Sequence, residues 1–210
     1  MMNNDTLHIE LQYFPTIVSY SALIDFKHVN FGLYESYRKA SFRNRCLIAG
    51  PNGVIALSIP IVGGRGLKAA YRDVRIDHGI PWRKRHFQAI RSSYGKSPFF
   101  GHYGDGLSRL YERRLEWLVD WNLSCLDWLD QALGVVSARQ VVAGESVSES
   151  EVDWRDRVGP GNHQSGEWGP FPVYHQMFEE KGGFQPNLSV LDLVMSIGRR
   201  GLDALIRGKG

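Results

Sequence analysis

The feature that most constrains the fold is a pair of short apolar segments joined by a turn sequence. Cys46–Ala49 and Val54–Ile59 flank Gly50-Pro51-Asn52-Gly53. Asn-Gly between two apolar runs is typical of a β-hairpin, because Asn and Gly accept the backbone conformation that a tight turn needs. The sequence therefore predicts an antiparallel hairpin here, with Pro60 ending its second strand.

Hydrophobic periodicity changes from alternation before and around the hairpin to helical spacing after Pro81. Pro81 suits the first position of a helix, and Ser189 with Asp192 resembles a capping box that begins another. The expected strands cover about residues 7–11, 29–33 and 74–76, and the expected helices about 17–24, 82–95, 107–118, 126–133 and 190–197. Strands followed by helices favour an α+β fold over a doubly wound sheet.

The length of 210 residues predicts a single domain over residues 1–210, with a β-rich N-terminal half and an α-helical half after it. From about residue 137 to 169 the sequence is polar, partly acidic and rich in Gly and Ser. We expect a long mobile loop there rather than a linker between domains.

Composition argues against several classes of protein. Cys46 and Cys125 are the only cysteines and form no Cys-x-x-Cys motif, which disfavours a disulfide framework and a zinc ribbon. The histidines lack metal-ligand spacing, and the glycines form neither a P-loop nor a dinucleotide fingerprint, so we expect no metal and no cofactor. The formal net charge of +3 is modest for a nucleic-acid binder, so nucleic acid is not an expected partner.

Nothing in the sequence indicates a membrane protein or an exported one. No segment approaches the roughly 20 apolar residues that cross a bilayer. The N-terminus lacks the basic start and apolar run of a signal peptide. We therefore expect no membrane span and a cytoplasmic location; the oligomeric state does not follow from the sequence.

The segment Lys39-Ala40-Ser41-Phe42-Arg43-Asn44-Arg45 is the strongest local candidate for a binding site. Arginine suits carboxylate or phosphate, lysine adds a point charge, and an amide can donate and accept as sugar hydroxyls require. If the segment alternates as a strand, Arg43 and Arg45 share one face and Asn44 lies on the other with Phe42. The non-functional alternative is a solvent-exposed edge strand, whose cations prevent aggregation with other strands.

His86 lies between Trp82 and Ile90 on the apolar stripe of its expected helix. One interpretation is a hydrogen-bonded core residue. The other is a buried imidazole that serves as a general base, with the basic residues 83–85 holding a nearby anion.

Cys46 directly follows Arg45, whose charge favours a thiolate. With His86 as base, Cys46 would be a nucleophile for acyl transfer. A free cysteine at the start of an apolar strand also commonly acts as a small buried hydrophobe.

Motifs along the chain occur in an order that resembles the WbqC-like protein family. They are Gln12-Tyr13-Phe14-Pro15, Tyr37-x-Lys39-x-x-Phe42-Arg43-Asn44-Arg45, Gly53, Leu57-x-Ile59-Pro60, Asp73-Val74-x-Ile76, Trp82-x-x-x-His86 and Tyr94-Gly95-Lys96-Ser97-Pro98-Phe99-Phe100. Residues 176–193 resemble the ending of a Bacteroidetes-type branch, although the last turn, residues 194–198, departs from that branch. The resemblance covers nearly all of the chain except residues 137–169.

The resemblance implies a role in the biosynthesis of lipopolysaccharide O-antigen or another surface polysaccharide, without defining a reaction. It directs attention to the positions where both branches of the family have similar residues: Gln12, Tyr37, Lys39, Asn44, Arg45 and His86. It disfavours Cys46, because the O-antigen branch often has asparagine at that position.

The leading hypothesis is a transferase-like protein that moves an acyl or aminoacyl group to an amino sugar carried on a nucleotide or lipid. His86 would be the general base, and the substrate-binding residues would be Gln12, Tyr37, Lys39, Arg43, Asn44 and Arg45. One alternative is a non-catalytic protein that binds a glycan or a partner of the same pathway. Another is a cysteine-dependent hydrolase or acyltransferase using Cys46. The sequence leaves open whether the protein is an enzyme.

Overall fold

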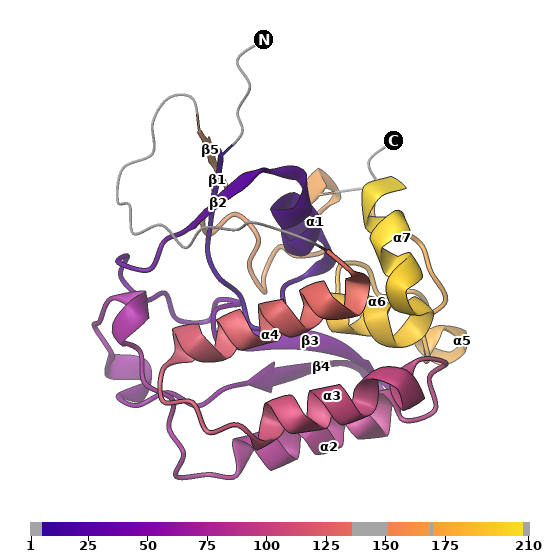
Figure 1. Ribbon diagram of the computed structural model, residues 1–210, viewed down its shortest axis with the longest axis horizontal. Coiled ribbons are helices and arrows are strands. Elements are labelled where there is room, and N and C mark those ends of the chain that lie inside the picture. The colour runs from indigo at the N-terminus through magenta and orange to yellow at the C-terminus, as the bar shows by residue number, and fades with distance from the viewer. Residues whose placement is uncertain (1–5, 136–150, 169, 208–210) are drawn as a thin grey trace.

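Strands occupy the first part of the chain and helices most of the rest (Figure 1). The computed structural model describes residues 6–135, 151–168 and 170–207. The strands are β1 (Thr6–Ile9), β2 (His28–Phe31), β3 (Arg45–Gly50), β4 (Gly53–Ser58) and β5 (Val152–Asp153). The α-helices are α1 (Ile17–Asp25), α2 (Trp82–Tyr94), α3 (Phe100–Glu112), α4 (Leu118–Leu133), α5 (Glu179–Gly182), α6 (Val190–Ile197) and α7 (Gly201–Arg207). The predicted α+β class is confirmed.

The hairpin is formed by β3 and β4, which pair antiparallel from Arg45 opposite Ser58 to Gly50 opposite Gly53. Gly53 has φ +111°, a conformation that side chains with a Cβ rarely adopt, so glycine is required at this position. The hairpin predicted from the Asn-Gly turn is therefore present with a two-residue loop.

The other sheet is parallel and has the strand order β2-β1-β5. Helix α1 forms the crossover between β1 and β2, as a parallel pair requires. Strand β5 comes from residues within the predicted loop, so the described part of that stretch, residues 151–168, contributes to the sheet. Residues 137–150 lie outside the described residues, and the mobility of the loop stays a prediction.

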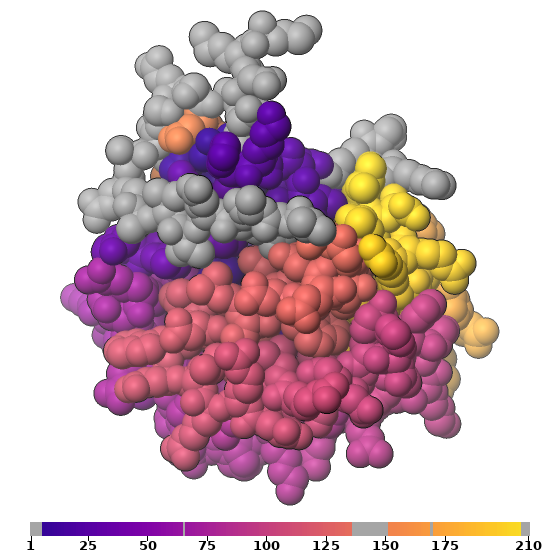
Figure 2. Space-filling view, in the orientation of Figure 1, coloured from indigo at the N-terminus to yellow at the C-terminus, as the bar shows by residue number. Residues whose placement is uncertain are grey.

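Helix α2 packs against β3 of the hairpin, α3 packs against α2, and α4 packs against α3 (Figure 1). The rings of Trp82 in α2 and Trp121 in α4 meet edge to face at 4.9 Å between their centroids. Figure 2 shows α3 and α4 forming much of the face turned to the viewer, with α6 and α7 at its edge. The buried side chains of these helices form one apolar core with those of the hairpin.

The helical stripe expected over residues 107–118 is divided between two helices. Helix α3 ends at Glu112, and α4 begins at Leu118. The Arg83 guanidinium donates to the carbonyls of Glu112 and Arg113 at 2.9 and 2.7 Å, so these end carbonyls of α3 are satisfied from outside the helix.

The strand expected around Val74 and Ile76 was wrong. Ile76 forms only an isolated bridge with Ile61, and Arg75 forms another with Trp117. Tyr71–Asp73 is a 3-10 turn that leads into this segment. The apolar side chains of Val74 and Ile76 are buried. Their alternation with polar residues therefore reflects burial of every second side chain and not hydrogen bonding to a neighbouring strand.

Helix α6 begins as predicted but not with a full capping box. The Ser189 hydroxyl accepts from the Leu191 backbone N–H at 3.1 Å. The Ser189 N–H donates to the carbonyl of Leu47 in β3. It therefore does not donate to the Asp192 carboxylate, as it would in a capping box. The buried Asp192 instead accepts from Tyr94 and Tyr174 at 2.7 and 2.6 Å, which joins α6 to α2 and to the segment before α5.

Candidate functional site

An open groove lies beside the first residues of β3 and the segment that follows β4. We call it the hairpin groove. It has a volume of about 700 Å³, within the range typical of small-molecule sites. Its lining residues are Tyr37, Lys39, Ala40, Asn44, Arg45, Ile59, Pro60, Ile61 and Gly64. Four of the seven residues singled out from the sequence therefore line one cavity.

Asn44 and Arg45 are held in place by the segment at the end of β4. The Asn44 side-chain amide donates to the Ile59 carbonyl at 2.9 Å, and the Ile59 N–H donates back to the Asn44 carbonyl at 2.8 Å. Arg45 Nε donates to the Ser58 hydroxyl at 3.2 Å. The terminal nitrogens of Arg45 have no partner among the described residues, so they are available to a ligand.

The hairpin groove combines positive charge with a neutral phenol. Lys39 is exposed and Arg45 is half-buried. Burial raises the pKa of Tyr37 to about 12, against the opposing effect of Arg43 and Arg45, so its hydroxyl keeps its proton near neutral pH. These groups together suit an anion that also carries hydroxyl groups.

Arg43 does not share a face with Arg45, contrary to the expectation from strand alternation. It is 0% exposed. Its Nη1 donates to Asp156 at 2.6 Å, and its Nη2 lies 3.6 Å from Glu35. The physical reason is that β3 begins only at Arg45, so the residues before it follow a turn rather than a strand.

Gln12 also lies away from the hairpin groove. It is 1% exposed, donates to Glu10 at 2.6 Å and accepts from the Thr16 N–H at 3.3 Å. The Glu10 carboxylate in turn accepts from the backbone N–H of Asp156, which pairs with Arg43. Gln12 and Arg43 therefore belong to one buried polar network behind the hairpin groove.

His86 is buried at 7% exposure and is not among the residues that line the hairpin groove. Burial lowers the pKa of His86 to about 4, against the opposing effect of a hydrogen bond to the Ser58 backbone. The ring is therefore neutral near pH 7. His86 Nδ1 lies within hydrogen-bond distance of the Tyr13 hydroxyl, 3.0 Å away.

Ser58 connects His86 with the hairpin groove. Its backbone bonds the imidazole, and its hydroxyl accepts from Arg45. On its other side, the Tyr13 hydroxyl forms a short hydrogen bond with the Tyr111 hydroxyl. Tyr13 belongs to the motif at residues 12–15, whereas no sequence signal pointed to Ser58 or Tyr111.

Cys46 and Cys125 are free and buried, at 1% and 0% exposure. Burial raises the pKa of both thiols, so the reactive thiolate is disfavoured. The structure gives no support to Cys46 as a nucleophile.

We expect iodoacetamide near neutral pH to leave both cysteines of the folded protein unmodified, because neither thiol is accessible or ionised. Mass spectrometry after a short exposure measures this, with urea-unfolded protein as the positive control for labelling. Rapid modification of Cys46 in the folded protein would contradict the expectation and restore the cysteine mechanism.

Within residues 6–135, 151–168 and 170–207, no three His, Cys, Asp or Glu side chains gather as metal ligands. None of the helices in these ranges has the length and apolar character needed to cross a membrane.

The fold and the hairpin groove define an α+β protein with a cationic ligand-sized cavity at the base of a hairpin. The chain belongs to the WbqC-like protein family, whose model matches residues 11–158. This match includes all seven candidate residues. It does not reach the segment 176–193, so the assignment to a Bacteroidetes-type branch stays a prediction.

A relative is the uncharacterized protein Rv1507c of Mycobacterium tuberculosis (strain ATCC 25618 / H37Rv). It is 26% identical over 197 residues, which cover 80% of this chain and 83% of the relative. No solved structure matches the chain.

Proposed function

We propose that this protein is a transferase-like protein of cell-surface polysaccharide biosynthesis, such as that of lipopolysaccharide O-antigen. In this proposal it binds a nucleotide- or lipid-linked amino sugar in the hairpin groove and transfers an acyl or aminoacyl group to it. Membership of the WbqC-like family supports the pathway, because the resemblance implies surface-polysaccharide biosynthesis. A cytoplasmic location is part of the proposal, on the sequence grounds given above.

The observation that carries the proposal is the convergence of Tyr37, Lys39, Asn44 and Arg45 on one groove. Lys39 and the free terminal nitrogens of Arg45 would bind the phosphate of the activated sugar. Asn44 and Tyr37 would bind its hydroxyl groups. Arg43 and Gln12 would not contact the ligand. Their buried network would instead hold the segment that carries these side chains.

The proposed reaction requires an activated acyl donor such as a thioester or an ester. The sugar amine forms the new amide bond with the acyl carbon, and the bond to the leaving group breaks with its electron pair. The amine gives up a proton, which we assign to His86 as general base. The pKa of about 4 makes His86 a weaker base than an ordinary histidine. The imidazole must also give up its bond to Tyr13 to accept this proton.

The burial of His86 favours a second candidate, a non-catalytic protein that binds the same glycan precursor. In that case His86 is a positioning residue that holds Ser58, and through it Arg45, at the hairpin groove. The two candidates share the ligand and differ in turnover.

The binding part of the proposal predicts that Arg45→Ala and Lys39→Ala each weaken binding of a UDP-linked amino sugar by about 10-fold or more, because each removes a charge-assisted contact to phosphate. Isothermal titration calorimetry measures the affinity. Arg38→Ala is the matched control, since Arg38 is an exposed cation directly before Lys39 and does not line the groove. Equal losses in all three variants, or no binding by the wild-type protein, would contradict the groove assignment.

Product formation with a labelled acyl donor separates the two candidates. For an enzyme, His86→Gln is expected to reduce turnover while the affinity for the sugar changes little. For a binding protein, no turnover occurs with the wild-type protein and any donor, and His86→Gln changes only affinity.

A further inference from the structure

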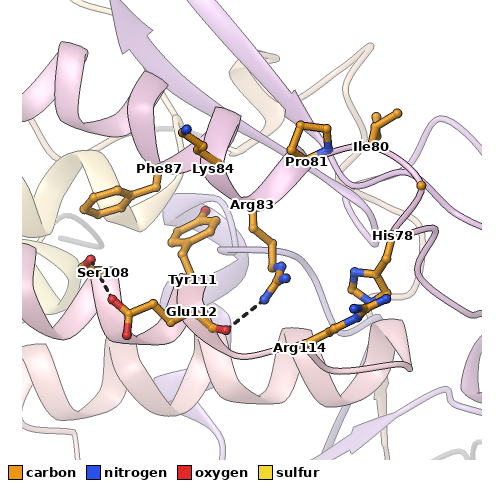
Figure 3. Close-up of a pocket in the computed structure, with 11 residues that line it drawn as sticks. His78, Ile80, Pro81, Arg83, Lys84, Phe87, Ser108, Tyr111, Glu112 and Arg114 are labelled. Atoms are coloured by element: carbon orange, nitrogen blue, oxygen red, sulfur yellow. Dashed lines mark hydrogen bonds between the residues drawn. The ribbon is translucent and has the colours of Figure 1, made fainter.

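A second groove lies between the first turn of α2 and the last turn of α3, and we call it the helix groove (Figure 3). Its volume is about 580 Å³, also within the range of ligand sites. Its lining residues are His78, Gly79, Ile80, Pro81, Arg83, Lys84, Phe87, Ser108, Tyr111, Glu112 and Arg114. None of these residues lines the hairpin groove, so the helix groove is a separate cavity.

Positive charge predominates in the helix groove. Arg83, Lys84 and Arg114 line it together with a single carboxylate, that of Glu112, which accepts from the Ser108 hydroxyl at 3.5 Å. Lys84 and Arg114 are exposed, and neither forms an ion pair with any carboxylate of the described residues. Three cations from two segments with only one carboxylate among them favour an anionic ligand.

Arg83 is held in a fixed position across the helix groove. Figure 3 shows its side chain extending from α2 to the main chain at Glu112. Only Nη1 is used in these bonds to the carbonyls of Glu112 and Arg113, so Nε and Nη2 retain donors. The Arg83 side chain is therefore already ordered in the free protein. Less conformational entropy is lost when a ligand binds to it, which favours binding.

The end of α2 adds to the same field. Pro81 provides no side-chain cap, and the first turn has no acidic residue. The Trp82 N–H donates to the Ile80 carbonyl, so the N–H groups of Arg83 and Lys84 are left for a ligand or solvent. The N-terminus of a helix favours phosphate because its free N–H groups and its dipole both attract negative charge. The N-terminus of α2 alone would not define a binding site. The site is defined by the three cations that line the groove beside it.

The opposite side of the helix groove is aromatic. The rings of Phe87 and Tyr111 lie 6.0 Å apart, and Figure 3 shows them next to each other beside Arg83. Phe87 is half-buried and so presents part of its ring to the cavity. A flat ring attached to the anion can pack there.

We propose that the helix groove is a second binding site, which takes a phosphate group attached to a flat ring, as in a nucleotide. Phosphate fits better than a single carboxylate because three cations line the helix groove, and a phosphate offers more charge and more acceptor oxygens to them. The inference does not rest on the proposed function of the hairpin groove.

The helix groove is also connected to His86. Tyr111 lines the groove, its hydroxyl bonds that of Tyr13, and Tyr13 bonds His86 Nδ1. A ligand that moves the Tyr111 ring changes this hydrogen-bond chain. Occupancy of the helix groove is therefore expected to alter the NMR signals of the His86 imidazole.

The test uses AMP, adenosine and inorganic phosphate as probes in calorimetric titrations of the full chain. AMP is expected to bind more tightly than either fragment. The double variant Lys84→Ala/Arg114→Ala should weaken AMP binding by about 10-fold or more, because two charge-assisted contacts are lost. The double variant Arg91→Ala/Lys96→Ala is the matched control: it removes the same charge from exposed positions outside the helix groove.

Two results would overturn the proposal: no AMP binding at millimolar concentration, or equal losses in both double variants. If adenosine binds as well as AMP, the phosphate assignment is wrong. Tyr111→Phe keeps the ring but removes the hydroxyl, so it should preserve AMP binding and abolish the response of His86. A His86 response that persists in this variant would contradict the connection through Tyr111.

Discussion

Replacing Arg43 with leucine is expected to lower the free energy of unfolding by about 3 kcal/mol, because this change removes a buried cation that faces the buried Glu10 and the half-buried Asp156 and Glu35. Arg43 is 0% exposed, and its guanidinium pairs with Asp156 and lies near Glu35. Glu10 lies in the same network, and its pKa is raised by burial against the opposing charge of Arg43. Loss of the arginine therefore affects three acidic groups together.

Urea unfolding monitored by tryptophan fluorescence measures this effect. Arg38→Ala is the matched control, because Arg38 approaches the same Asp156 at 3.3 Å but its side chain is 65% exposed. An exposed pair of this kind contributes only about 0–1 kcal/mol. If the two variants lose the same stability, the buried network does not hold this part of the fold.

The second large effect is a dependence of stability on pH that originates in His86. Burial lowers the pKa of His86 from 6.5 to about 4. Between these values the unfolded chain binds a proton that the folded protein does not, so the stability rises with pH in this window. His86 therefore contributes fully above pH 6.5, and its contribution is lost as the pH falls toward 4. A shift of this size corresponds to roughly 3 kcal/mol.

The free energy of unfolding measured from pH 7 to pH 4 should thus fall less steeply in His86→Gln than in the wild-type protein. His102→Gln is the control, since it makes the same substitution at an exposed histidine. An NMR titration gives an independent check, with the His86 imidazole expected to stay neutral at pH 6. An ordinary titration near pH 6.5 would show that the ring is hydrated rather than buried.

Those elements whose signals are local in sequence could be predicted. The hairpin depended on the turn at residues 50–53, and α2 on its helical stripe after Pro81. The end of α4 followed from Gly134, whose φ of +72° is typical of a glycine that terminates a helix. In each case the residues whose pattern predicts the element are also the residues that form its backbone hydrogen bonds.

Prediction failed where a partner distant in sequence satisfied the backbone or the charge. Val74 and Ile76 alternate like a strand, yet no neighbouring strand pairs with them beyond isolated bridges. Asp192 has the spacing of a capping residue, but Tyr94 and Tyr174 donate to its carboxylate instead. The parallel pairing of β5 with β1 joins residues about 145 positions apart and has no short-range signal.

The sequence by itself determined the α+β class, the hairpin and the cationic segment that leads into it, because each depends on neighbouring residues. Only the tertiary structure decided which of these cations line the hairpin groove. Lys39 and Arg45 line the hairpin groove, whereas Arg43 turns inward, where the half-buried carboxylates of Asp156 and Glu35 pair with it. The same holds for His86, whose helix places it behind Ser58 rather than in the groove. Burial and charge compensation depend on all the segments that meet at a point, and no local pattern records them.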